Sequence, residues 1–84
     1  GPVTITATPR IVPIGKDTTL TWNLNGNDSS TCTLTGGTLN ITGTDLDDGT
    51  ETVTVRARTK YTLSCTSGYT GFVYVDIVPT GYET

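Results

Sequence analysis

Apolar and polar residues alternate with a period of two along much of the chain. The clearest case lies between residues 18 and 24, where Leu20, Trp22 and Leu24 fall on one side and polar residues fall on the other. Successive side chains of a β-strand point to opposite faces, so this pattern predicts a strand with one buried face. Similar patterns predict further strands at 3–7, 31–35, 39–41, 50–55, 61–65 and 72–78.

The segments between these patterns are rich in glycine, asparagine and aspartate, which favour turns. Pro9 is expected to stop the first strand, because proline cannot donate to a strand ladder. Ile11 and Ile14 are then expected to continue the same edge. No window shows helical periodicity. Short strands with turns every 8 to 12 residues predict an all-β fold, a two-sheet sandwich of about seven strands.

The inward-facing apolar positions predict the core of this sandwich. Its expected members are Ile5, Leu20, Trp22, Leu34, Val53, Tyr61, Leu63, Val73 and Val75.

The length of 84 residues corresponds to one small domain. We expect a single domain over 1–84 with its core at 3–78. The pair Gly1-Pro2 is typical of a cloning remnant, and 79–84 has the composition of a linker stub. Threonine occurs 21 times, and its β-branched side chain favours strands over helices.

The formal net charge of −3 argues against binding to nucleic acid, which requires a basic surface. The longest apolar run, Phe72 to Val75, is too short to span a bilayer, so no membrane insertion is expected. Histidine, the usual general base, is absent. We therefore expect a domain that is not an enzyme and uses no cofactor.

Three motifs in this order carry a family resemblance: Thr19-Leu20-Thr21-Trp22, Thr31-Cys32-Thr33, and the stretch from Lys60 to Thr66 (KYTLSCT). Together they resemble bacterial immunoglobulin-like domains of cell-surface and secreted proteins, over roughly Ile5 to Val78. The resemblance implies an extracellular or cell-surface module that serves as a stalk or repeat, or sometimes as an adhesive domain. It brings no catalytic residues.

The sequence departs from the antibody pattern in two ways. Trp22 precedes Cys32 by ten residues, whereas the core Trp of antibody domains follows the first Cys. Trp22 therefore falls on the second strand, as in fibronectin type III domains, and a disulfide between Cys32 and Cys65 would join neighbouring strands of one sheet. Tyr61 lies four residues before Cys65, whereas antibody domains have a spacing of two, and a tyrosine corner is still expected, as in fibronectin type III domains. The alternative for the two cysteines is a pair of buried free thiols.

Four residues are candidates for contact with a ligand or partner. Phe72 and Tyr74 lie opposite the apolar face of their strand, so they are expected to be exposed, where aromatic rings can contact a protein or a glycan. Cross-strand packing on a solvated sheet is the alternative. Asn25 and Asn27 lie in a polar loop. Trp22 alternates with core leucines and is therefore expected inside rather than as a sugar-stacking platform.

The segment from Thr44 to Gly49 contains three carboxylates, which are Asp45, Asp47 and Asp48. Calcium prefers such oxygen ligands, but the spacing does not match an EF-hand loop, so a solvated turn without a metal is expected.

Two further patterns call for a surface location. Asn27-Asp28-Ser29 and Asn40-Ile41-Thr42 match the N-glycosylation pattern. Arg56, Arg58 and Lys60 form a basic run that is expected at a solvated corner, where it would offset nearby acids.

These observations favour a structural module that neighbours other domains of a parent chain and is monomeric in isolation. The second hypothesis is an adhesive module that binds a glycan or a protein through its loops or exposed aromatic residues.

Overall fold

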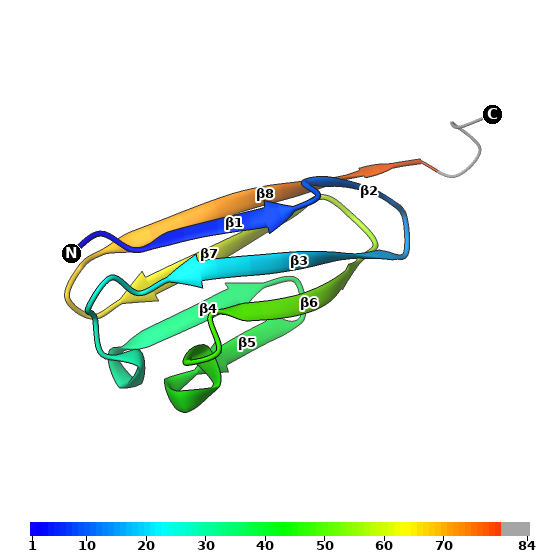
Figure 1. Cartoon of the computed structure of the whole chain (residues 1–84). Helices are drawn as coiled ribbons and strands as arrows, with labels where there is room; N and C mark the ends of the chain where they lie inside the picture. The colour runs from blue at the N-terminus through cyan, green and yellow to red at the C-terminus, as the bar shows by residue number, and fades with distance from the viewer. Residues whose placement is uncertain (80–84) are drawn as a thin grey trace.

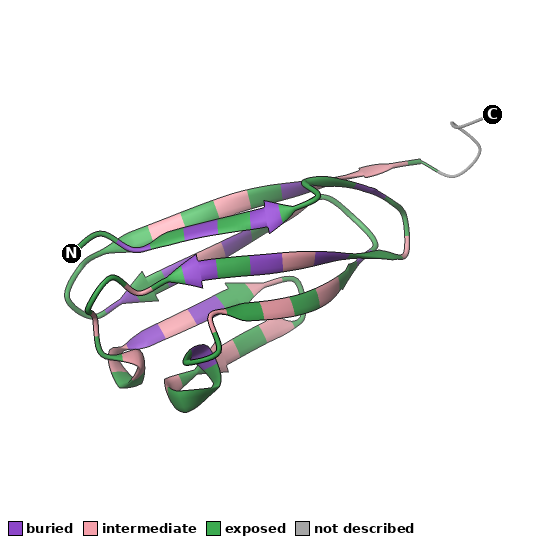
Figure 2. Cartoon of the chain, viewed as in Figure 1, coloured by how far each residue is buried: buried purple, intermediate pink, exposed green. Residues whose placement is uncertain are grey.

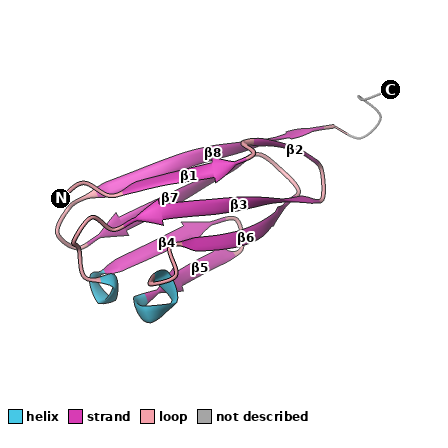
Figure 3. Ribbon diagram, viewed as in Figure 1, coloured by secondary structure: helices cyan, strands magenta, loops and turns pink. Residues whose placement is uncertain are grey.

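The computed structural model describes residues 1–79, which form eight β-strands and two short 3-10 helices (Figures 1 and 3). The expected linker stub therefore lies, apart from Pro79, outside the described residues. The elements in chain order are β1 (Thr4–Thr8), β2 (Ile11–Pro13), β3 (Lys16–Asn23), η1 (Ser29–Thr31), β4 (Cys32–Gly36), β5 (Leu39–Thr42), η2 (Gly43–Leu46), β6 (Thr50–Val55), β7 (Thr59–Cys65) and β8 (Thr70–Val78).

The strands form two sheets that pack face to face (Figure 1). The first has three strands in the order β1-β3-β6, and the second has five in the order β2-β8-β7-β4-β5. Neighbours are antiparallel except for β2 and β8, which are parallel. The chain crosses between sheets after β1, β2, β3, β5 and β6. This arrangement confirms the predicted all-β two-sheet sandwich.

The strand beyond the expected seven is β2, and it corrects the prediction for the segment after Pro9. The chain does not continue the edge of β1 there. It changes sheets and pairs with the end of β8, where the Asp76 amide donates to the Arg10 carbonyl over 2.8 Å. As a result Val12 enters the core, whereas Ile11 and Ile14 are exposed.

Buried and exposed residues alternate along most strands (Figure 2). Seven of the nine residues predicted for the core are buried, while Val53 and Val73 are half-buried and pack against it. Both lie on strands with an unpaired edge, which leaves their side chains partly open to solvent. The core also contains residues that were not on the predicted list, namely Val3, Ala7, Val12, Cys32, Leu46, Val55 and Cys65.

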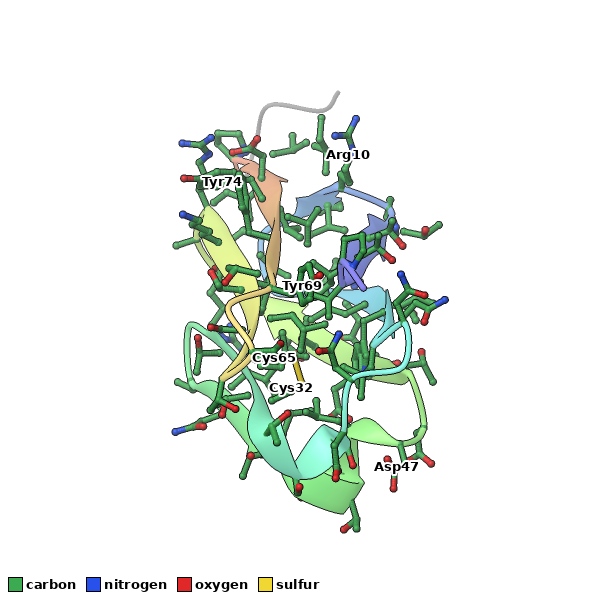
Figure 4. The ribbon with its side chains drawn as sticks, turned by 90° about the vertical axis from the view of Figure 1, so that its left-hand side faces the viewer. Arg10, Cys32, Asp47, Cys65, Tyr69 and Tyr74 are labelled. Atoms are coloured by element: carbon green, nitrogen blue, oxygen red, sulfur yellow. A yellow bond between two sulfur atoms is a disulfide. The ribbon has the colours of Figure 1, made fainter. Side chains whose placement is uncertain are left out.

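The two cysteines form a disulfide, as predicted. Cys32 of β4 lies directly opposite Cys65 of β7, so the bond joins adjacent strands of the five-stranded sheet. Both residues are buried, and Figure 4 shows the bond in the interior of the domain. The alternative of two free thiols is thereby excluded.

Gly71 allows the two sheets to approach each other along one side of the sandwich. A Cβ atom at this position would lie 2.9 Å from the Val3 carbonyl oxygen, which belongs to the backbone just before β1. A backbone atom cannot move aside as readily as the end of a flexible side chain.

We therefore expect Gly71→Ala to lower the free energy of unfolding by about 1–3 kcal/mol, as other overpacked substitutions do. Chemical denaturation would measure the change. Thr70→Ala, on the exposed neighbour in the same strand, is the matched control and should change stability by less than about 0.5 kcal/mol. Equal effects of the two substitutions would contradict the close approach.

Candidate interaction surface

Phe72 and Tyr74 stand on the outer face of the five-stranded sheet, as predicted. They are 56% and 40% exposed, respectively. Their ring centroids are 5.9 Å apart with an interplanar angle of 82°, an edge-to-face arrangement. Because the rings are nearly perpendicular, they do not form one flat platform.

Two basic side chains from the neighbouring segment cover these rings. The Arg58 guanidinium lies 4.3 Å from the centroid of Tyr74, and the Lys60 Nζ lies 4.6 Å from that of Phe72. The register of β7 and β8 explains this placement, since Lys60 pairs directly with Tyr74. Cation–π contacts at exposed sites contribute about 0.5–1 kcal/mol each.

Arg58 also forms an ion pair with Asp76, with 2.9 Å between Nε and Oδ1. Both side chains are at least half exposed, so the pair contributes little to stability and mainly orients the guanidinium. We refer to Arg58, Lys60, Phe72, Tyr74 and Asp76 as the aromatic–cation cluster. Sequence reasoning found its aromatic members and its basic members separately, but it did not bring them together.

The edge of β8 beside this cluster is open. The Cys65 amide donates a hydrogen bond to the Tyr69 carbonyl, so these two residues form a hydrogen-bonded pair at the end of the β7–β8 ladder. Along an antiparallel ladder, hydrogen-bonded pairs alternate with pairs that are not hydrogen-bonded. The backbone groups of Phe72 and Tyr74 consequently point away from β7, in the same direction as the Asp76 amide. A shallow groove follows this edge, lined by Pro9, Arg10, Ile11, Phe72, Val73, Tyr74 and Asp76.

Asn25 and Asn27, the other contact candidates, lie in the β3–β4 loop and are not part of the aromatic–cation cluster. The Asn25 Nδ2 donates to the Pro2 carbonyl over 3.0 Å, and the Asn27 Nδ2 donates to the Gly1 carbonyl over 2.7 Å. The Asn27 Oδ1 accepts a hydrogen bond from Ser67. These amides therefore hold the loop against the N-terminal residues and the β7–β8 turn.

The two glycosylation patterns differ in their surroundings. A glycan would be attached to the side-chain nitrogen, and in Asn27 this nitrogen already donates to the carbonyls of Gly1 and Leu24. Asn40 is exposed on the edge strand β5. Modification at Asn40 would therefore disturb the fold less.

The acidic segment holds a core residue. Leu46, in the last position of η2, is 1% exposed, and its carbonyl accepts a hydrogen bond of 2.9 Å from the Trp22 Nε1. Trp22 is itself buried, as predicted, and cannot act as a sugar-stacking platform.

Asp45, Asp47 and Asp48 remain on the surface. Among residues 1–79, no group of three or more histidine, cysteine, aspartate or glutamate side chains is placed to hold a metal ion.

Tyr61, the expected tyrosine-corner residue, is buried at the start of β7. Burial raises the pKa of its phenol above the ordinary value, and the hydrogen bond with the Thr59 side chain opposes this shift.

This pKa shift predicts a loss of stability at alkaline pH. The unfolded chain releases the phenolic proton first, so the contribution is complete below about pH 10 and is lost as the pH rises through the folded-state pKa. Within that window the contribution of Tyr61 to the free energy of unfolding should fall by no more than about 1.4 kcal/mol per pH unit, the limit for one proton. Denaturation of the wild type and Tyr61→Phe from pH 8 to 11 would measure the slope. The same slope in both proteins would rule out Tyr61 as its source.

Comparisons with protein-family models, with curated proteins and with solved structures found no match to this chain. In the part of the chain that the structure describes, no helix is long and apolar enough to cross a membrane.

Proposed function

We propose that this domain is a non-catalytic immunoglobulin-like module that acts as a structural spacer in a larger surface or secreted protein. One observation carries the proposal. The N-terminal residues and the end of β8 lie at opposite ends of an elongated sandwich with extents of 46 × 19 × 16 Å (Figure 1). A domain with this geometry can be placed in series with others and adds its full length to the chain.

The strand order supports the immunoglobulin-like part of the proposal. In such sandwiches, the first, second and fifth principal strands share one sheet, and the third, sixth and seventh share the other. Apart from the short strand β2, the corresponding strands of this domain are divided between the sheets in the same way, and the fourth principal strand, β5, differs because it pairs with β4 in the five-stranded sheet. The motifs around Trp22, Cys32 and Cys65 add sequence support.

The buried disulfide supports the extracellular part of the proposal. Disulfides persist in oxidising compartments and are rare in the cytosol. Small secreted domains use such bonds because their cores are limited.

Pulling experiments on single molecules would test the spacer role. Tension between the two termini loads the strands along their length, so many hydrogen bonds must break together. In a second geometry, the force is applied at the exposed positions Asn40 and Thr52, which lie on edge strands β5 and β6 of different sheets. Force in that direction separates the edge strands from their neighbours one hydrogen bond after another. We expect a higher unfolding force through the termini. An equal or lower force in that direction would contradict a load-bearing spacer.

The second candidate function is adhesion, and the exposed rings of Phe72 and Tyr74 favour it. A screen of glycans and extracellular proteins against the isolated domain separates the two functions. Saturable micromolar binding that Phe72→Ala or Tyr74→Ala abolishes would establish adhesion. Ser64→Ala, at an exposed position on the neighbouring strand, is the control. The spacer role predicts no such binding.

A further inference from the structure

The basic side chains gather at one end of the domain. All five lie at or next to the turns at the end where β8 finishes: Arg10 between β1 and β2, Lys16 at the start of β3, Arg56 and Arg58 between β6 and β7, and Lys60 near the start of β7 (Figure 1). Only two acidic residues of the described chain, Asp17 and Asp76, share this end. We call it the basic end.

The opposite end carries acidic side chains. Asp28 lies in the β3–β4 loop, Asp45, Asp47 and Asp48 lie in or after η2, and Glu51 lies near the start of β6. No lysine or arginine of the described chain shares this end, which we call the acidic end. Hydrogen bonds from the Ser30 amide and hydroxyl lower the pKa of Asp28.

The aromatic–cation cluster orders two charges of the basic end. Arg58 is held between the Tyr74 ring and the Asp76 carboxylate, and Lys60 rests over Phe72. Side chains held in this way lose less conformational freedom when they meet a partner.

We propose that the basic end docks onto the acidic end of a second copy of this chain. This inference deepens the spacer role. The contact is head to tail, so each copy keeps one free end that can bind a further copy. The chain leaves the domain at the basic end and enters at the acidic end, so docked copies would continue in one direction.

The contact is weak between separate molecules. The two shorter extents of the domain, 19 and 16 Å, give an end face of about 300 Å², well below the roughly 800 Å² per partner of stable interfaces. Electrostatic attraction must therefore dominate, and it is screened over about 10 Å at 0.1 M salt but over about 30 Å at 0.01 M. The isolated domain is accordingly monomeric at ordinary salt, and docking becomes measurable at low salt or when copies are linked.

Sedimentation of the 84-residue chain at high concentration tests the proposal. We expect the average mass to rise above that of the monomer at 10 mM NaCl and to return to it at 500 mM, with at least a tenfold fall in the association constant. A mass that equals the monomer at both salt concentrations would overturn the proposal.

A variant with the same net charge tests whether the separation of charge between the two ends causes the association. Arg10→Glu, Arg56→Glu, Asp47→Lys and Asp48→Lys together leave the total charge unchanged but equalise the two ends; all four side chains are exposed. Association at 10 mM NaCl should be lost in this variant while its unfolding midpoint stays near that of the wild type. Unchanged association would overturn the proposal. If the variant fails to fold, the exchange of Arg56→Asp and Asp48→Lys alone should still weaken association.

The same samples test whether an acidic polysaccharide, rather than a second copy of the chain, binds the basic end. Retention of the wild type on a heparin column at 10 mM NaCl, together with a monomeric mass, would assign the basic end to an acidic polysaccharide and overturn self-docking. None of these results bears on the pulling experiment, so self-docking can fail while the spacer role stands.

Discussion

Loss of the Cys32–Cys65 disulfide should lower the free energy of unfolding by about 3–4 kcal/mol. The bond closes a loop with a sequence separation of 33 residues, and the chain-entropy model assigns such a loop a gain of this size. Small domains have a total stability of about 5–15 kcal/mol, so the reduced domain would be marginal at best. Denaturant unfolding with and without reductant would measure the difference.

The double variant Cys32→Ala/Cys65→Ala is the matched control. Reductant should leave its stability unchanged, because it contains no bond to reduce. A loss of less than about 1 kcal/mol on reduction of the wild type would show that the bond contributes little beyond the packing of its sulfur atoms.

The bond also limits how far the unfolded chain extends under load. Residues between the two cysteines cannot lengthen while it is intact. At roughly 3.4 Å per residue, reduction should add about 110 Å to the length released on unfolding. The increment would appear directly in the pulling experiment on the two termini.

Leu20→Ala should cost about 2–4 kcal/mol of unfolding free energy. Leu20 lies on β3, the central strand of the three-stranded sheet, and its side chain has no exposed surface. Its truncation removes apolar contacts with the facing sheet and leaves a cavity, because the surrounding strands relax only in part. Thermal or denaturant unfolding would measure the change.

Thr21→Ala is the control for this substitution. Thr21 is the next residue on the same strand, but it is exposed on the other face. Its replacement should change stability by less than about 0.5 kcal/mol. If Leu20→Ala shifts stability by no more than this, the inferred facing of β3 is wrong.

Local alternation was sufficient to predict most of the fold. Strand β3 shows why: Leu20 and Trp22 occupy one face, and the period of two leaves no other way to bury both. The facing of Phe72 and Tyr74 followed from the same rule. The predicted pairing of Cys32 with Cys65 followed once their strands were expected to be neighbours in one sheet.

Residues outside regular alternation were harder to predict. Val12 sits in a three-residue strand between two prolines, too short to show a period. Leu46 is flanked by aspartates, so its segment has the composition of a solvated turn. Each is buried because the chain around it folds back over an open part of the core, which depends on contacts with segments distant in sequence.

The aromatic–cation cluster shows the same limit. The sequence placed Phe72 and Tyr74 outside and Arg58 and Lys60 in a basic run, but it gave no sign that they meet. Their contact depends on the register of β7 against β8, since a shift by one residue would turn Lys60 to the other face.

The sequence by itself determined the fold class and most strand faces, because these follow from local spacing and residue chemistry, and it predicted the disulfide once the two cysteine strands were expected to be neighbours. Only the tertiary structure decided the separation of charge. Arg10 and Lys16 are distant in sequence from Arg58, yet the antiparallel strands return the chain to the same end each time. Charges spread along the sequence thus become two opposite ends, because strand length and direction, rather than sequence distance, fix where each turn lies.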